Sequence, residues 1–488
     1  MHYRISVSKK LYLKTITLCS CLVVLSACKT DEALPSKGAN ISHNYSVERQ
    51  QNTAGSFNGS SRENSTQYST TSVNTTRSKS ENAETQNLAL TSLAQATSTK
   101  ALSANLAATS STVVINASSS DAKQQLEKAL CSTMSTTTTA CADTTPRVIQ
   151  INGVIDFTNV DGQTSSVGCI YSENQCKDTK GQEQILSVDD YCKGKSLFNI
   201  SFKKAGQNPL LVGSNKTIIG LGASSGIKGK GLMLKAGVSN ITIKNLNITD
   251  INEQVIWAGD AITIDNASNV VIDHNYIARI GRQFVVTGWG AAKNVVISNN
   301  NFDGTTGYGH YCDNRHYWNF LFLGANQTIT LKQNWIHNTS GRAPELGQSD
   351  SVSGLGLVHV VNNLYQSNYY MGVRTSPKVL AFVEANYFDN AANLKGSFQP
   401  IFKKTSSDLV FAPYSSNIAQ ANAYCSSKLG RNCEANFYTN FSSSDAFELN
   451  GGALSSQYGL AIKDFVGGTK PMSVNSVKQY VLANAGPK

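Results

Sequence analysis

One short pattern recurs along the second half of the chain: an aliphatic residue, any two residues, an asparagine, any residue and an apolar residue. The five copies occupy residues 272–277, 297–302, 331–336, 360–365 and 383–388. Starting from Asn275, their asparagines are 25, 34, 29 and 23 residues apart. An earlier segment, residues 243–248, fits the pattern except that Leu246 stands at the asparagine position. Repeats of this length, with β-branched runs and no helical period, are typical of a stacked solenoid.

The repeat predicts an all-β fold, the right-handed, single-stranded parallel β-helix. Each coil contributes short strands to parallel sheets, and its apolar residues stack on those of its neighbours. We expect each repeated asparagine to adopt a left-handed backbone conformation at a bend and to hydrogen-bond to the next coil. Loops of different length explain the uneven spacing, and on one face they would build a cleft. A β-sandwich predicts turn signals about every 8–12 residues, but no fixed register of asparagines.

Composition excludes two classes of protein. Only 40% of the 488 residues are hydrophobic, and no apolar run reaches the roughly 18 residues that a membrane-spanning helix needs. The net charge is +10, but the basic residues do not cluster as they do in nucleic-acid-binding proteins. We therefore expect no nucleic acid as a partner, whereas an acidic or partly neutralised polymer is compatible with this mild excess of positive charge.

The first 27 residues are typical of a secretory signal. Four basic residues precede the apolar stretch 18–27, which is too short to span a membrane. The stretch ends in Leu25-Ser26-Ala27-Cys28, which resembles a bacterial lipobox and favours lipidation of Cys28. An acylated Cys28 would hold the mature chain at a membrane surface without spanning it. Because Lys29 is not the aspartate that retains lipoproteins at the inner membrane, the outer membrane or cell surface is favoured, with simple secretion as the alternative.

Residues 28–112 are rich in Ser, Thr and Asn and hold few, unperiodic apolar residues. Such a segment buries too little surface to offset the entropy of ordering it. We therefore expect a disordered tether over residues 28–112, followed by the β-helix domain over residues 113–488, which we expect to be a monomer.

Eleven cysteines are present, of which Cys19 and Cys21 lie in the signal and Cys28 is the expected lipid site. The other eight form an even set in an exported chain, which predicts four disulfides, although the residues alone leave their pairing open. No cysteine pair or Cys/His cluster has the spacing of a zinc site.

Seven short motifs follow one another in an order that resembles the pectate/pectin lyase family of polysaccharide lyases, and within it the fungal pectin lyases. The resemblance runs from about Arg147 to residues 483–486. One such motif would be weak evidence, whereas seven in order are strong. The motifs are residues 215–220, 226–232, 257–262, 272–274, 278–283, 316–318 and 340–344.

The resemblance implies cleavage of α-1,4-galacturonan by β-elimination. A base takes the proton on C5, and positive charge stabilises the developing carbanion around the C6 oxygens. Arg342 matches the family's catalytic arginine and is the expected base, although a guanidinium is normally always charged. Burial and a neighbouring cation are needed to make its neutral form accessible, and Arg282 is the expected neighbour. Trp257 and Trp318 match aromatic positions of the cleft, where apolar ring faces suit a methylated sugar.

The same resemblance bears on calcium. The pectate-cleaving branch of the family holds a calcium ion with carboxylates on this face. Here Asp260 keeps an acidic position, but Arg282 stands in a region where the calcium users place an acidic ligand, and Gly347 replaces a second arginine of the motif. We expect Asp260 to pair with Arg282, no metal or other cofactor, and methyl-esterified pectin as the substrate. A calcium-dependent pectate lyase and a non-catalytic, polysaccharide-binding β-helix remain the alternatives.

The cysteine pattern also resembles that of the fungal enzymes. It implies the disulfides Cys169–Cys192, Cys176–Cys312 and Cys425–Cys433, and leaves Cys131–Cys141 as an additional pair. The loop after Cys169 and Tyr191 lack the tryptophans that fungal pectin lyases carry there, so a less aromatic cleft is expected. Asp273 and His274 are expected to be structural.

Overall fold

The computed structural model describes residues 110–171, 181–288, 290–324, 326–347, 356–368, 373–375, 379–389, 402–403, 409–439, 463, 465–466 and 469–488. The expected signal, the lipidation site Cys28, the tether to residue 109 and Cys176 lie outside the described residues. No helix among the described residues is long and apolar enough to cross a membrane.

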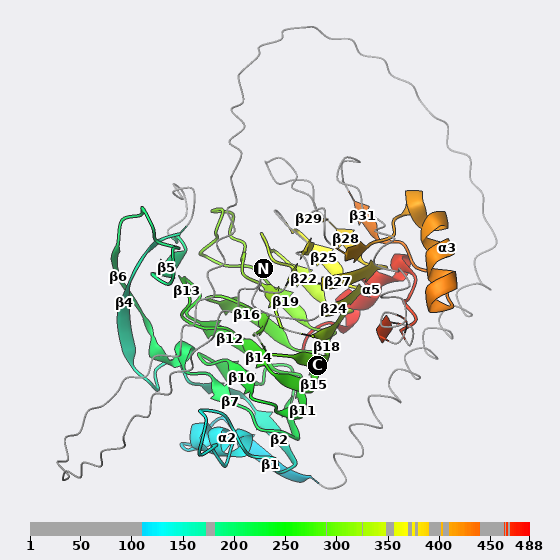
Figure 1. The fold of residues 1–488 in the computed structure, drawn as a ribbon. Coiled ribbons are helices and arrows are strands. Elements are labelled where there is room, and N and C mark those ends of the chain that lie inside the picture. The colour runs from blue at the N-terminus through cyan, green and yellow to red at the C-terminus, as the bar shows by residue number, and fades with distance from the viewer. Residues whose placement is uncertain are drawn as a thin grey trace, which may run out of the picture. The chain divides into compact units, whose positions relative to one another are not determined.

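Three parallel sheets run the length of the described chain, and each coil visits them in the same order (Figure 1). Sheet 1 contains β1 Ser111–Asn116, β2 Arg147–Asn152, β8 Lys216–Gly220, β11 Ser239–Lys244, β15 Ala267–Asp273, β18 Ala292–Ser298, β21 Thr328–Lys332, β24 Gly356–Val361, β27 Val379–Glu384 and β30 Leu409–Phe411. Sheet 2 contains β3 Val154–Asp156, β9 Gly226–Lys228, β12 Asn247–Ile251, β16 Tyr276–Ile280, β19 Asn301–Asp303, β22 Trp335–His337, β25 Leu364–Gln366, β28 Tyr387–Asp389 and β31 Phe437–Thr439. Sheet 3 contains β7 Leu210–Leu211, β10 Leu232–Lys235, β14 Ile262–Asp265, β17 Val285–Thr287, β20 Phe320–Phe322, β23 Glu345–Leu346, β26 Val373–Thr375 and β29 Phe402–Lys403. This is the predicted right-handed parallel β-helix.

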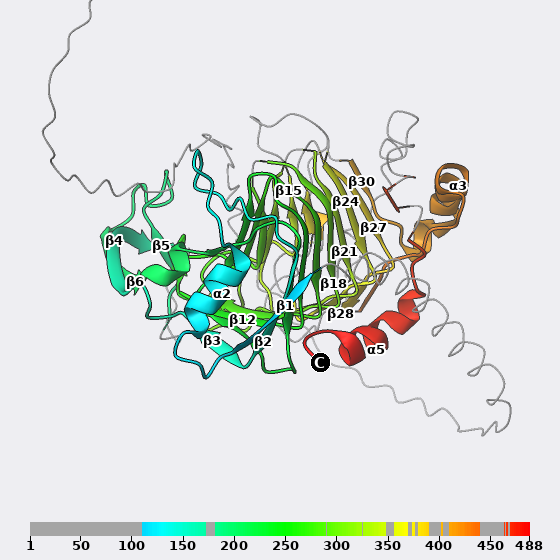
Figure 2. The same cartoon turned by 90° about the horizontal axis from the view of Figure 1, so that it is seen from below.

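The core consists of aliphatic side chains stacked in register from coil to coil. In sheet 1 one such stack is fully buried, and Figure 2 shows its strands side by side. Burial of each aliphatic side chain stabilises the fold by about 1.5–3 kcal/mol, so the stack accounts for much of the coil-to-coil cohesion. Its members are Ile243, Ile272, Ile297, Leu331, Val360 and Val383.

The repeated asparagines form a continuous buried ladder at the turn from sheet 1 to sheet 2. The side-chain oxygen of Asn334 accepts from both the backbone N–H and the Nδ2 of Asn300, at 2.9 and 3.0 Å. The ladder runs from Asn275, whose oxygen accepts the N–H of Leu246, to Asn436, beyond the predicted repeats. The predicted hydrogen bonding between coils is therefore confirmed.

One part of that prediction is wrong, because the left-handed residue is the one before the ladder asparagine. His274, Asn299, Gln333, Asn362 and Ala385 have φ between 53° and 59°. These residues turn the chain, and the asparagine side chains that follow them bond to the next coil. Since histidine, glutamine and alanine all adopt this conformation here, packing of the coil imposes it rather than the intrinsic preference of asparagine.

Replacing Asn334 with alanine should destabilise the domain by about 3–5 kcal/mol, because two buried donors of Asn300 lose their acceptor and the carbonyl of Ile297 loses a donor, at about 1–3 kcal/mol each. Asn294→Ala is the matched control. Asn294 belongs to an exposed asparagine pair with Asn269, so it should lose only about 1 kcal/mol through its left-handed backbone. Denaturant unfolding measures both losses, and equal losses for the two variants would contradict the ladder's role.

Helices and a side sheet complete the domain. Helix α2, Ala122–Leu130, buries Leu126 and Leu130 in the core at the N-terminal end. Helix α3, Ile418–Leu429, packs with β27 and β30, and α5, Val474–Asn484, contacts β25 and β28. Two 3-10 turns, η1 Lys204–Gln207 and η2 Ser415–Asn417, and helical residues at 463 and 465–466 are also present, and the side sheet contains β4 Gln163–Ile170, β5 Gln184–Leu186, β6 Phe198–Lys203 and β13 Val255–Ile256.

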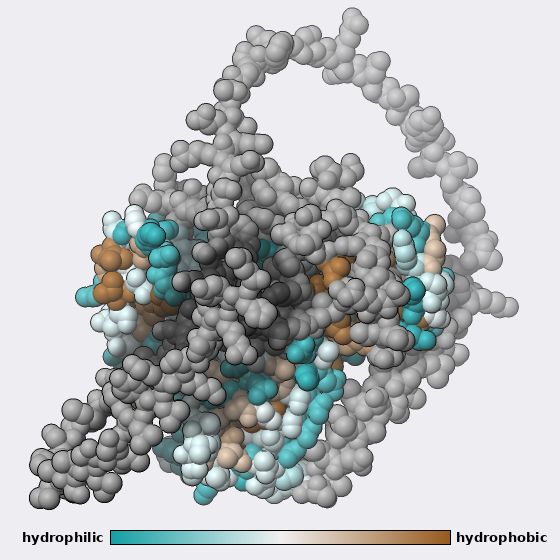
Figure 3. Space-filling view, viewed as in Figure 1, coloured by the Kyte–Doolittle hydropathy of each residue, from teal (hydrophilic) through white to brown (hydrophobic). Residues whose placement is uncertain are grey.

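Hydrophobic side chains are exposed where β4 and β6 project from the coils. Val167, Leu197 and Phe198 keep 48%, 57% and 38% of their surface exposed, and brown surface marks this region at the left of Figure 3. On its buried side, the side sheet packs Leu186, Ile200 and Phe202 against Val255 and Ala258.

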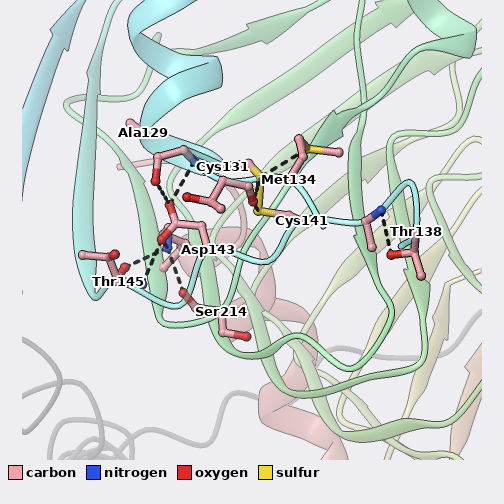
Figure 4. Close-up of a disulfide and its surroundings, with 12 residues drawn as sticks. Ala129, Cys131, Met134, Thr138, Cys141, Asp143, Thr145 and Ser214 are labelled. Atoms are coloured by element: carbon pink, nitrogen blue, oxygen red, sulfur yellow. Dashed lines mark hydrogen bonds and ion pairs between the residues drawn. A yellow bond between two sulfur atoms is a disulfide. The ribbon is translucent and has the colours of Figure 1, made fainter. Parts of the chain in front are cut away.

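Three of the expected disulfides are present: Cys131–Cys141, Cys169–Cys192 and Cys425–Cys433. Because Cys176 is outside the described residues, its pairing with Cys312 stays a prediction. Figure 4 shows Cys131–Cys141 beside the buried carboxylate of Asp143. Burial raises the pKa of Asp143, but hydrogen bonds from Ser132, Arg147 and Thr145 lower it more, so the net pKa is well below its usual range. The disulfide thus lies next to a charged anchor that fixes the segment leading into the coils.

Candidate active site

The residues singled out by sequence come together at the entry to sheet 3. Trp257 and Asp260 precede β14, Arg282 precedes β17, Trp318 precedes β20 and Arg342 precedes β23. These four strands are neighbours in sheet 3. Because each coil repeats the path of the one before it, residues far apart in sequence are placed on one line along the solenoid.

Asp260 and Arg282 form a two-pronged ion pair, as expected. Arg282 donates from Nε and Nη2 to the two carboxylate oxygens of Asp260, at 2.8 and 2.6 Å. The backbone N–H of Gln283 donates to the same carboxylate at 2.9 Å. Bidentate, charge-assisted bonds of this kind fix both groups in position. Both oxygens of Asp260 are therefore already engaged by protein donors.

A face of the Arg282 guanidinium lies on Trp257, with the carbon of the guanidinium 4.1 Å from the ring centroid. Tyr191 lies edge-on to the same ring, with centroids 5.8 Å apart. An aromatic face stabilises a cation, so Trp257 holds Arg282 while the partly buried indole also offers apolar surface.

Arg342 lies in a denser setting than Arg282. Its guanidinium carbon is 4.4 Å from the centroid of Trp318 and 5.8 Å from that of Tyr317. The amide of Gln283, oriented with its oxygen toward Arg342, accepts from Nη1 at 3.1 Å and donates to the carbonyl of Trp318 at 3.3 Å. Gln283 thus links the Asp260–Arg282 pair to Arg342.

Trp318, expected to contact the sugar, is buried. Only 2% of its surface is exposed, and its ring packs against the guanidinium of Arg342. The partly buried Trp257 is better placed for the predicted contact with a sugar. Its indole N–H donates to the buried carboxylate of Glu183 at 2.5 Å, and the other oxygen of Glu183 is 2.7 Å from Nδ1 of His310. The aromatic residue faces inward because this carboxylate, supplied by the side sheet, binds its polar edge.

Two further residues at Arg342 were missed by sequence reasoning. Nε of Arg342 lies 2.5 Å from Oε2 of Glu345, and Oε1 of Glu345 lies 3.4 Å from Nη1 of Arg374. The expected cationic neighbour of Arg342 was Arg282, but Arg282 is paired with Asp260. Arg374 is a cation that opposes the charge of Arg342.

The balance of these groups keeps Arg342 protonated in the free protein. Burial and Arg374 lower the pKa of Arg342, but the Glu345 carboxylate and the phenols of Tyr317 and Tyr191 raise it more, so the net pKa is above its ordinary value. Any role as a base therefore requires the influence of Glu345 to be reduced.

His316 has a structural, hydrogen-bonding role and does not transfer a proton. Its Nε2 lies 2.7 Å from the carbonyl of Arg282 and 3.0 Å from that of Trp318. Burial lowers the pKa of His316 to about 4, so it is neutral near pH 7. Asp273 and His274, expected to be structural, bond to each other at 2.7 Å at the end of a sheet 1 strand.

A calcium site of the pectate type does not fit these groups. Asp260 has both oxygens bonded to Arg282, and a permanent cation beside it opposes a second one. Within the described ranges no group of three or more His, Cys, Asp or Glu side chains is arranged to bind a metal ion.

The family model for pectate lyase matches residues 177–488. The chain belongs to the pectate lyase family. Among curated proteins it is 42% identical to probable pectin lyase F of Neosartorya fischeri, covering 60% of this chain and 74% of that protein. It is 39% identical to probable pectin lyase E of Aspergillus fumigatus, covering 70% of this chain and 86% of that protein. The resemblance to fungal pectin lyases is thereby confirmed.

Among solved structures, a mutant pectate lyase of Bacillus subtilis matches with a TM-score of 0.45 and 17% identity, over 78% of this chain and 92% of that one. The fold of this pectate lyase family member is established by its strand register.

Proposed function

We propose that the protein is a pectin lyase that cleaves methyl-esterified α-1,4-galacturonan by β-elimination without a metal ion. The observation that carries the proposal is the bidentate bond of Arg282 to Asp260. It places a fixed cation where a calcium-using relative needs an open carboxylate. The curated relatives support the same substrate by their names.

The arrangement supplies the groups that the reaction needs. Arg342 is assigned as the base that takes the proton from C5, and Arg282 stabilises the negative charge that develops on the C6 oxygens. Asp260 and Gln283 position Arg282, and Gln283 also contacts Arg342. Electrostatic stabilisation by fixed groups is effective because they need no reorganisation when the charge develops.

The outward row of sheet 3 supports an esterified substrate. Register partners share one face of a parallel sheet, and one outward row carries no charge from β7 to β20, whereas the next outward pair on β10 and β14, Lys235 and Asp265, is charged. An uncharged ester with a methyl group suits such a surface better than a carboxylate does. The row consists of Leu211, Met233, Thr263, Val286 and Leu321.

Formation of unsaturated products tests the proposed activity directly. The C4–C5 double bond formed by elimination absorbs ultraviolet light, so product can be followed continuously on highly methylated pectin and on fully de-esterified polygalacturonate. Faster product formation on the methylated polymer supports the proposal. If neither polymer yields unsaturated product, the protein is a non-catalytic, polysaccharide-binding β-helix.

We also propose that a lipid on Cys28 holds the enzyme at the outer membrane. Replacing Cys28 with serine should release the protein from membranes and leave its specific activity unchanged, because the site lies in the β-helix and the lipid in the segment before it. Fractionation of cells that express either form measures this release. Continued sedimentation of the serine variant with outer membranes after a salt wash would show that lipidation is not the anchor.

A further inference from the structure

Glu345 and Arg374 occupy paired positions on neighbouring coils. β23 and β26 are parallel neighbours in which Glu345 and Arg374 are direct register partners. Side chains of such partners leave the sheet on the same face, roughly 5 Å apart. Both face the entry to sheet 3, where Arg342 immediately precedes β23.

One carboxylate is therefore shared by two guanidinium groups. Oε2 of Glu345 faces Nε of Arg342 at 2.5 Å, and Oε1 faces Nη1 of Arg374 at 3.4 Å. The contact with Arg342 is short, but Nε and Oε2 are not aligned as donor and acceptor, and neither has a hydrogen-bond partner. Arg342 is thus held by charge more than by directed bonds, which is the kind of contact a second cation can weaken.

We propose that Arg374 is a positioning residue of the elimination: it binds Glu345 and draws that carboxylate away from Arg342, which frees Arg342 to act as the base. This inference rests on the proposed function. Arg374 need not touch the sugar for this role, since it acts through Glu345.

The proton balance of the step is as follows. The guanidinium of Arg342 first gives a proton to solvent, and its neutral form then takes the proton from C5. The C–H electron pair becomes the C4–C5 double bond, and the C4–O bond breaks. The departing oxygen keeps that bond's electron pair and takes a proton from water. Arg374 favours the first part of this sequence, because a neighbouring cation opposes charge on Arg342.

The ionisable groups that face Arg342 come from several elements, and only Glu345 and Arg374 are changed in the test below. In the described part of the chain these are the carboxylate of Glu345 on β23, the guanidinium of Arg374 on β26, and the phenols of Tyr317 before β20, Tyr191 after β5 and Tyr171 after β4. Among these groups, Glu345 and Arg374 form the ion pair described above.

The test compares Glu345→Gln with Arg374→Gln on highly methylated pectin across a range of pH. Removing the carboxylate should raise kcat about three- to tenfold at each pH where the rate still rises with pH. A larger fraction of Arg342 is then neutral, which raises the rate. Each neutral Arg342 is a somewhat weaker base, which limits the gain. Removing the cation should lower kcat by a similar factor. Arg374→Lys keeps the charge and should stay within about twofold of the wild type.

Opposite shifts of the two pH profiles, with rescue by Arg374→Lys, support the inference. Equal losses in both variants show a merely structural pair, and a raised KM with unchanged kcat in Arg374→Gln shows a direct substrate contact; either result overturns it. Melting temperatures identify any variant that fails to fold. If Arg374→Gln does not fold, the direction of the change in kcat of Glu345→Gln tests the inference by itself. If the wild type makes no unsaturated product, the proposed function itself fails, which is a different result from product with unshifted profiles.

Discussion

Arg342→Lys should abolish elimination while the fold stays intact. A lysine amine is a compact charge on a flexible stem and cannot face Glu345, Gln283 and the ring of Trp318 together, as the guanidinium does. Loss of a positioned acid–base group costs about 10²- to 10⁴-fold in rate. The expected loss lies in kcat, measured by ultraviolet absorbance of the unsaturated products.

Arg279→Lys is the matched control for this variant. Arg279 also has a left-handed backbone, with φ of 56° against 45° for Arg342, and it pairs with Asp250 through two donors. It lies on β16 in sheet 2, away from the entry to sheet 3, so its replacement should leave turnover unchanged. Wild-type turnover in a folded Arg342→Lys protein would disprove its assignment as the base.

Arg282→Asp should lower kcat/KM on methylated pectin by about 10²- to 10³-fold, since one fixed cation at the developing charge is worth about that factor. The variant also places a second carboxylate beside Asp260 in place of its partner. Two carboxylates repel each other and together attract a hard cation. Added calcium should therefore restore part of the lost activity, and more on de-esterified than on methylated polymer.

Arg279→Asp controls for the loss of a paired arginine elsewhere on the β-helix. It makes the same chemical change in a bidentate Arg–Asp pair that is more exposed, and it should leave the rate almost unaltered. If both variants lose the same activity, the effect of Arg282 comes from stability. If Arg282→Asp keeps wild-type turnover, Arg282 has no part in the reaction.

The fold could be predicted because its main determinant is local in sequence. Each ladder asparagine follows an aliphatic run at a fixed offset, so the coil boundaries are visible without any structure. Asn436 was not predicted, because Cys433 stands at the aliphatic position of the repeat and 50 residues separate Asn436 from Asn386. A second, more exposed row was also missed, although Asn240, Asn269 and Asn294 each precede a β-branched run.

The site could be predicted only in part. The resemblance to the family identified Asp260, Arg282 and Arg342, and the structure brings the first two into contact. Glu345 and Arg374 match no motif, yet the repeat could have paired them. The same 29 residues separate Asn334 from Asn363 and Glu345 from Arg374, so the two lie at the same position of successive coils.

Glu183 could not be found in that way. It directly precedes β5 of the side sheet and contacts Trp318, 135 residues further along the chain, and the side sheet does not follow the coil period. The indole N–H of Trp318 donates to this carboxylate, and Trp318 is buried. Contacts within the solenoid follow from the repeat, whereas contacts with an inserted sheet require coordinates.

The activity of the wild-type protein with and without a calcium chelator tests the central claim most directly. Because both carboxylate oxygens of Asp260 are already bonded to Arg282, product formation on highly methylated pectin should be unchanged by the chelator and by added calcium. It should be slower on de-esterified polygalacturonate. If the chelator stops product formation and calcium restores it, the protein is a calcium-dependent pectate lyase, and the role assigned to Arg282 is wrong.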